Sequence, residues 1–108
     1  MAQVYSSALG EFKEVEGSQV MVTEGGKVTV VRCIDVFHGF QVTPVAGRVV
    51  GPGGAAFFGY YSKTPFESLT QQWFGWRGRQ VFRELEEIVI HQISGNADWR
   101  LSGYLLNP

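Results

Sequence analysis

Two histidines and a few acidic side chains are the residues of this sequence that could bind a metal ion or activate a nucleophile. His38 and His91 are the only histidines, and Asp35 and Asp98 are the acids available to join them. A zinc site needs three or four converging ligands, but Asp35 and His38 are three residues apart and would point to opposite faces of a strand. No serine or cysteine is placed beside His91 by spacing. We therefore expect structural roles for both histidines, and no metal ion or other cofactor.

Glutamates offer a second route to catalysis, through the paired carboxylic acids that cleave glycosidic bonds. Glu84, Glu86 and Glu87 supply the carboxylates. Residues 84 and 86 would share one face of a strand, whereas the acids of a glycosidase lie on opposite sides of the bond that they cleave. Charge runs of this kind are normally solvated, so we expect no catalytic residues and no enzyme activity.

The run Gly51-Pro52-Gly53-Gly54 has the glycine content of a phosphate-binding loop. Such a loop ends in Gly-Lys-Ser or Gly-Lys-Thr and opens a helix, so that backbone N–H groups and the lysine converge on the phosphates. Ala55-Ala56-Phe57 follows here instead. The run is therefore predicted to be a turn between two strands.

The overall composition excludes several classes of partner. The chain has 108 residues, the length of a single domain (1–108), and its nine basic and ten acidic side chains give a formal charge of −1. Proteins that bind nucleic acid carry a clustered basic excess, so we expect no nucleic-acid partner. No apolar run reaches the length of about 18 residues that a membrane span needs, and the first residues lack the order of a signal peptide. We expect no membrane insertion.

Apolar residues recur with period two or in short runs, and glycine-rich turns interrupt them at short intervals. This pattern predicts strands at 19–23, 28–37, 45–50, 55–61, 71–76, 80–82, 87–94 and 98–106. We expect a β-hairpin across 24–27, because Gly25-Gly26 allows the positive φ of a tight turn. The last two strands are expected to be antiparallel neighbours joined by a turn at 95–98. Residues 63–69 are compatible with one helical turn, with Thr64 as its N-cap and Pro65 at the first helical position.

About eight short strands with polar loops are typical of two packed sheets. We therefore expect an all-β fold, and within that class a single-domain antiparallel β-sandwich. A jelly-roll or Greek-key order is favoured over a closed barrel, while the order of the strands stays open.

The densest feature of the sequence is a segment, 57–76, that holds eight of the fifteen aromatic side chains. Neighbouring rings at 57 and 58, and at 60 and 61, should point to opposite faces of a strand, so that one set requires a cover. The rings could fill the core, contact a partner, or stack on a carbohydrate. Tyrosine, tryptophan and arginine dominate interface hot spots. The residues expected at an interface are Tyr60, Tyr61, Trp73, Trp76, Arg77 and Arg79.

Three segments of the sequence carry a family resemblance: Phe74-Gly75-Trp76-Arg77-Gly78-Arg79-Gln80-Val81, Glu87-Ile88-Val89-Ile90 and the closing Asp98-Trp99-Arg100-Leu101-Ser102-Gly103-Tyr104-Leu105-Leu106. These segments resemble small virion proteins of tailed bacteriophages that infect actinobacteria. In those proteins a small β-sandwich ends on a Ser-Gly-Tyr-Leu strand. The resemblance covers the C-terminal third and the strand at 28–36. It implies a minor tail or capsid-associated component, located in the virion and assembled in the host cytoplasm, without catalytic residues.

Together these observations predict a non-enzymatic structural protein. It would act through aromatic-rich interfaces with copies of itself and with other virion proteins. The alternative is a carbohydrate-binding module that uses Trp73 and Trp76 as a stacking platform.

Overall fold

The computed structural model describes residues 4–62 and 69–107. In this part of the chain the backbone forms six strands and a short 3₁₀ turn, without an α-helix. The strands are β1 (Val4–Val22), β2 (Val28–His38), β3 (Ala46–Val50), β4 (Ala56–Tyr61), β5 (Gln72–Phe82) and β6 (Glu87–Leu106), and the turn η1 is Pro52–Gly54. Every strand pairing is antiparallel. The expected all-β antiparallel fold is confirmed.

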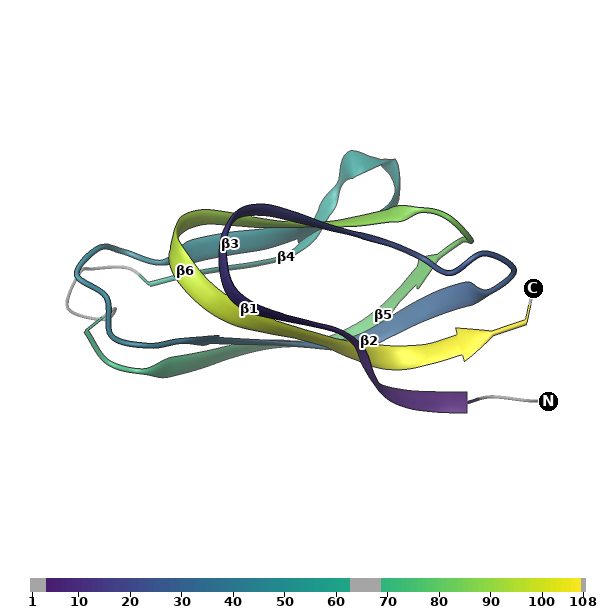
Figure 1. The fold of residues 1–108 in the computed structure, drawn as a ribbon, viewed down its shortest axis with the longest axis horizontal. Coiled ribbons are helices and arrows are strands. Elements are labelled where there is room, and N and C mark those ends of the chain that lie inside the picture. The colour runs from purple at the N-terminus through teal and green to yellow at the C-terminus, as the bar shows by residue number, and fades with distance from the viewer. Residues whose placement is uncertain (1–3, 63–68, 108) are drawn as a thin grey trace.

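The strands belong to one sheet in the order β4-β3-β6-β2-β5, and β1 pairs with β6 along its other edge. β6 is long enough to have different neighbours at its two ends. Gln92 lies opposite Gly47 of β3, whereas Trp99 lies opposite Val36 of β2. The sheet therefore folds over on itself into a nearly closed, barrel-like body with two facing layers (Figure 1).

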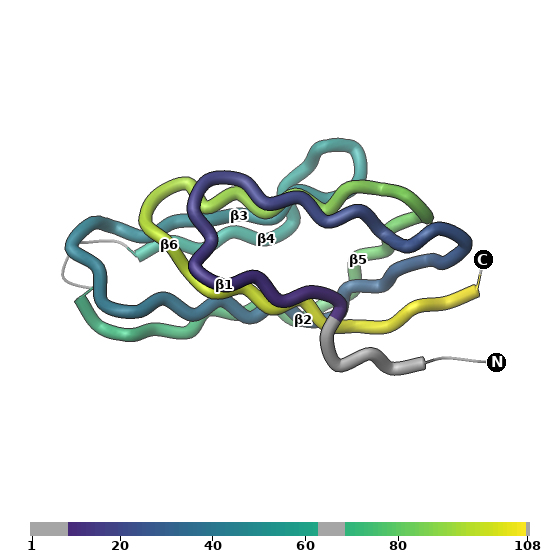
Figure 2. The backbone as a smooth tube through the Cα atoms, in the orientation of Figure 1, coloured from purple at the N-terminus to yellow at the C-terminus, as the bar shows by residue number. Residues whose placement is uncertain are grey.

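The two layers are named here by the shorter strands that they contain. The β3–β4 layer consists of β3, β4, residues 87–92 of β6 and residues 17–22 of β1. The β2–β5 layer consists of β2, β5, residues 98–106 of β6 and residues 4–12 of β1. Figure 2 shows β1 and β6 running side by side around one end of the molecule, from one layer into the other.

The bend in β6 corrects one prediction. The segment 95–98 was expected to be a turn between two neighbouring strands, but it lies inside the continuous strand β6. Gly95 has a φ of 71° there, which lets the strand bend sharply. Pairing with β1 is irregular at the bend: Ala97 lies opposite Val15, with a register shift on each side of this pair. The Glu14 backbone N–H donates a hydrogen bond of 2.8 Å to Asp98 Oδ1. β1 bends in step with β6, so regular pairing resumes on both sides of the bend, at Phe12 with Trp99 and at Gly17 with Gln92.

The glycine turn at 24–27 corrects a second prediction. Gly26 has the expected positive φ of 76°, but β1 and β2 do not pair with each other, so the turn is not a hairpin. The turn connects β1 in the β3–β4 layer to β2 in the β2–β5 layer. Residues 83–86 also connect the two layers, from β5 to β6. Thr23 joins the two crossings: its hydroxyl donates to the Arg83 carbonyl at 2.6 Å and accepts from the Glu86 N–H at 2.9 Å. Side-chain hydrogen bonds here replace a hairpin ladder.

The structure has six strands where about eight were predicted. The predicted strands 71–76 and 80–82 form the single strand β5, because β2 pairs with it throughout and absorbs the irregularity in a bulge between Val31 and Cys33. The strands predicted at 87–94 and 98–106 form β6. The turn predicted at 51–54 is confirmed as η1, between β3 and β4. The helical turn considered at 63–69 begins at residues outside those that the structure describes.

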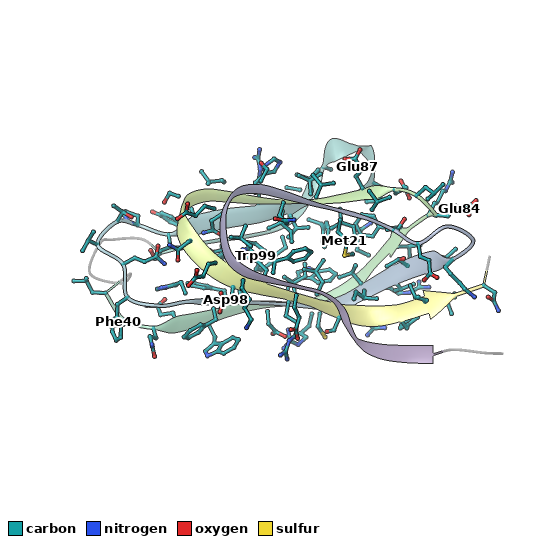
Figure 3. All side chains as sticks on the ribbon, in the orientation of Figure 1. Met21, Phe40, Glu84, Glu87, Asp98 and Trp99 are labelled. Atoms are coloured by element: carbon teal, nitrogen blue, oxygen red, sulfur yellow. The ribbon has the colours of Figure 1, made fainter. Side chains whose placement is uncertain are left out.

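The core lies between the two layers. Its fully buried side chains include Val31, Ile34, Val36, Val45, Val49, Phe82, Ile88, Ile90, Trp99 and Leu101. The rings of Tyr60 in β4 and Phe74 in β5 lie 4.8 Å apart and so connect the edge strands of the two layers. Figure 3 shows Trp99 and Met21 pointing into the space between the layers. Much of the aromatic segment 57–76 is therefore core.

Candidate functional site

The two histidines have different environments. His38 is fully buried, its Nδ1 is 2.8 Å from the Gly39 carbonyl oxygen, and its ring stacks on Phe74. His91 is half-buried, and its Nδ1 is 2.9 Å from the Ser18 hydroxyl. Within residues 4–62 and 69–107, the structure brings together no group of three histidine, cysteine, aspartate or glutamate side chains that could bind a metal ion.

The glutamates at 84 and 86 lie in the turn after β5, and not on a strand face as predicted. The Glu84 carboxylate accepts a hydrogen bond from the Gly26 backbone N–H, and the Glu86 carboxylate accepts one from the Arg83 N–H. Both carboxylates thus satisfy backbone donors of the two layer crossings. This arrangement explains the acidic run in structural terms.

The rings of Phe57 and Phe58 both pack toward the core, which corrects the expectation that they point to opposite faces. The cause is a bulge: Val49 lies opposite Phe58 and Val50 lies opposite Ala56, so Phe57 is an additional residue without a partner. Phe57 contacts the ring of Trp76 edge-on at 5.1 Å. One residue's insertion therefore removes a ring from the surface of β4.

Of the six residues predicted at an interface, Tyr60 and Trp76 face inward. Tyr60 is buried, and its hydroxyl accepts a hydrogen bond of 2.7 Å from Gln92 Nε2. Burial raises the pKa of Tyr60 from 10.0 to about 12, although the hydrogen bond from Gln92 acts in the opposite direction. Trp76 is partly buried against the core. Both rings therefore contribute to the core, and Trp76 keeps only part of its surface exposed.

The other four predicted residues face solvent. Trp73 is 71% exposed and Tyr61 is 58% exposed. Arg77 and Arg79 lie on the outer face of β5. The hydrogen bond from Arg79, together with a weaker one from Arg32, lowers the pKa of Tyr104 against the effect of burial. Trp73, Arg77 and Arg79 are separated by even numbers of residues, so β5 presents a ring and two guanidinium groups along one face.

A second exposed surface was not predicted. We define the apolar end as Phe40, Val42, Leu69 and Ile93. Phe40 is 70% exposed, Val42 is 81% exposed and Ile93 is 62% exposed. These side chains line a hollow of about 720 Å³ at the end where β1 and β6 bend. Figure 3 places Phe40 at the opposite end of the molecule from Glu84. A sequence signal existed: Phe40 and Val42 are apolar although they lie in a loop between a glycine and a proline.

Hydrogen bonds attach the loop of the apolar end to the bend of β6. Gln41 Nε2 donates to the Asn96 carbonyl at 2.7 Å, and the Asn96 N–H donates to Gln41 Oε1 at 2.8 Å. The Ser94 hydroxyl donates to the Pro44 carbonyl. Because Gln41 points back to the strand, its neighbours Phe40 and Val42 are presented outward. Their exposure follows from the position of the loop.

Ion pairs cover the outer face of the β2–β5 layer. Arg77 Nη2 lies 2.9 Å from Asp35 Oδ1, and this hydrogen bond and charge raise the pKa of Arg77. Arg100 Nε lies 3.2 Å from Glu11 Oε1. Beside these pairs the ring of Trp73 packs on that of Phe37, in a register where the two residues are directly opposite. The face thus combines one exposed ring with charges of both signs.

The sequence matches no protein-family model and no curated protein sequence. Among the described residues no helix has the length and apolar character needed to cross a membrane. Function must therefore be argued from the apolar end and from the outer face of the β2–β5 layer.

Proposed function

We propose that this protein is a non-enzymatic structural subunit that assembles with copies of itself and with other proteins through its apolar end. The observation that carries the proposal is the exposure of Phe40, Val42, Leu69 and Ile93 around one hollow. Scattered apolar side chains are normal on a protein surface, but a contiguous group commonly marks an interaction site.

The size of the expected gain supports this role. Burying a large apolar side chain completely contributes about 1.5–3 kcal/mol. The four side chains of the apolar end are left partly exposed by the protein's own core. Burying them against a partner would therefore contribute part of this free energy. Association costs consume much of such a gain in a single contact. In a symmetric assembly many weak contacts of this kind add together, so that the total gain exceeds the costs of association.

The outer face of β5 provides a second contact in this proposal. Trp73, Arg77 and Arg79 are exposed there, and Tyr61 is exposed on β4. These are residue types that contribute most to interface hot spots. Both β4 and β5 are also edge strands, whose outer backbone groups can pair with another chain.

We assign the assembly to a bacteriophage virion, as a minor tail or capsid-associated subunit, on the resemblance of the C-terminal third. We also classify the two facing layers as a β-sandwich of the jelly-roll or Greek-key kind. Support for this class comes from the connections: among successive strands only β3 and β4 pair with each other. The neighbours of the gene test the virion role, because capsid and tail genes are expected beside it. Their absence would exclude that role.

Sedimentation or light scattering of the purified chain tests assembly. We expect oligomers that dissociate in the double variant Phe40→Ser, Ile93→Ser. Val22→Ser is the matched control, since Val22 is also exposed but lies outside the apolar end. A wild-type chain that stays monomeric at high concentration, and that binds no capsid or tail protein, would refute the proposal.

A further inference from the structure

The outer face of the β2–β5 layer contains an aromatic platform. Trp73 lies near the start of β5, an edge strand, and is 71% exposed. Its ring centroid is 4.8 Å from that of Phe37, with an angle of 40° between the rings. Phe37 belongs to the neighbouring strand β2 and supports one side of the indole. The indole is thus held in place while much of its surface stays open to solvent.

A small hollow of about 90 Å³ lies beside this platform. Its walls come from four strands: Trp73 from β5, Asp35 from β2, Asp98 and Arg100 from β6, and Lys13 from β1. In the strand register Phe37 lies opposite Asp98, and Asp35 lies opposite Arg100. The regular β pairing therefore places carboxylate and guanidinium groups next to the exposed ring.

The charges around the hollow balance in pairs. Asp35 is paired with Arg77 at 2.9 Å, and Glu11 is paired with Arg100 at 3.2 Å. Lys13 Nζ lies 3.9 Å from Asp98 Oδ2. An ionic ligand would gain little from such a neutral set. Carboxylates nevertheless keep lone pairs that accept hydrogen bonds, and guanidinium and ammonium groups keep N–H donors.

From this combination we propose that the hollow and Trp73 bind a neutral carbohydrate. A pyranose ring has an apolar C–H face that can pack on the indole and a rim of hydroxyl groups that donate and accept hydrogen bonds. Binding sites for small molecules generally pair an apolar wall with a few oriented polar groups. The hollow is smaller than the roughly 300 Å³ of an enclosing pocket, so the sugar lies against the surface and is gripped from one side.

Single-stranded nucleic acid fits the face less well. Nucleobases also stack on tryptophan, but proteins that bind single strands add a positively charged groove for the phosphates. Here Asp35 and Asp98 line the hollow beside the ring. The predicted platform of two tryptophans is reduced to one ring, because Trp76 packs inward while Trp73 faces solvent. A single ring suits contact with one or two sugar units.

The test is titration of the whole chain with five neutral oligosaccharides, namely cellohexaose, laminarihexaose, maltohexaose, mannohexaose and chitohexaose. Saturation-transfer NMR and calorimetry report binding. We expect at least one of them to bind with a dissociation constant between about 10 μM and 1 mM. Trp73→Ala should weaken that binding at least tenfold, while Tyr61→Ala, which removes an exposed ring elsewhere, should leave it unchanged. Binding should also be insensitive to salt, because the ligand is uncharged.

Either of two results would overturn the proposal: no binding of any of the five sugars at about 1 mM, or binding that Trp73→Ala leaves intact. Circular dichroism of Trp73→Ala checks that this exposed position is not needed for folding. Trp73 also belongs to the second contact of the proposed assembly, so the titration is repeated with the variant Phe40→Ser, Ile93→Ser, which should not assemble. Sugar binding should be at least as strong in this variant as in the wild type, and the two proposals can then fail separately.

Discussion

The indole Nε1 of Trp99 donates a hydrogen bond of 2.9 Å to Gln92 Oε1, across the bend of the strand that contains both residues. Gln92 in turn donates from Nε2 to the Tyr60 hydroxyl at 2.7 Å. All three side chains are buried. A β-carbon at Gly47 would lie 2.8 Å from both the Trp99 and the Tyr60 rings, so glycine leaves the room that this network needs. The network holds the two halves of β6 in their bent arrangement.

Removing the side-chain amide of Gln92 should destabilise the protein. In Gln92→Leu the Trp99 N–H would be buried without its acceptor, and such a group costs about 1–3 kcal/mol. We expect a loss of about 2–4 kcal/mol in the free energy of unfolding, measured by urea denaturation. Adding Tyr60→Phe should cost less than the sum of the single changes, because the two residues share one network. An unchanged denaturation midpoint in Gln92→Leu would contradict this role.

Burial of Tyr60 predicts a loss of stability at high pH. The unfolded chain ionises Tyr60 near 10.0, and the folded chain does so at about 12. The difference in pKa therefore contributes fully to the free energy of unfolding below pH 10.0, and this contribution is lost as the pH rises toward 12. Two pKa units correspond to about 2.7 kcal/mol.

Tyr60→Phe is the matched comparison for this pH dependence. The variant lacks the hydrogen bond to Gln92, so its free energy of unfolding at neutral pH should be lower by about 1 kcal/mol. Between pH 10.0 and 12 its stability should depend less on pH than that of the wild type. Tyr104, whose pKa is lowered, has the opposite sign but is present in both proteins. Denaturation curves at several pH values provide the measurement, and parallel pH profiles would show that Tyr60 is not the group responsible.

Thr23 should be needed for the two layer crossings. Thr23→Val keeps the shape of the side chain but deprives the Arg83 carbonyl and the Glu86 N–H of their hydroxyl partner. We expect a loss of about 2 kcal/mol and faster hydrogen exchange at the Glu86 amide. Thr23→Ser retains the hydroxyl and should remain within about 1 kcal/mol of the wild type. Equal stability of the valine and serine variants would argue against the hydrogen bonds.

Gly103 should tolerate no side chain. A β-carbon at this position would lie 1.9 Å from the Val30 carbonyl oxygen, which is backbone and cannot rotate away. We expect Gly103→Ala to lose at least about 3 kcal/mol or to fail to fold. Gly59→Ala is the control, because its β-carbon would meet its nearest atom at an ordinary 3.6 Å. The control should change stability by about 0.5 kcal/mol or less. Thermal unfolding of both variants decides the matter, and a fully stable Gly103→Ala would mean that the strands can separate there.

From the sequence, Trp73 and Trp76 were expected to act together on one surface, and for Trp76 this was wrong. Residues three apart on a strand point to opposite faces, and Trp73 faces solvent while Trp76 packs inward. The same reasoning separated Tyr60 from Tyr61 but could not say which of them is buried. That choice depends on Phe74 and Trp99, which approach Tyr60 from distant parts of the chain. The apolar end was not predicted from the sequence either. The exposure of its loop residues depends on the hydrogen bonds between Gln41 and Asn96, which are distant in sequence.

The sequence by itself determined that the chain is built from antiparallel strands, because period-two alternation and glycine turns are local properties that need no partner. Tertiary structure decided which turns are hairpins and which are crossings. A glycine at 26 or at 95 permits a positive φ in either case, and only the neighbouring strand determines whether pairing continues through it. Pairing energy between residues distant in sequence therefore sets the shape of the sheet, and with it the side chains left for partners.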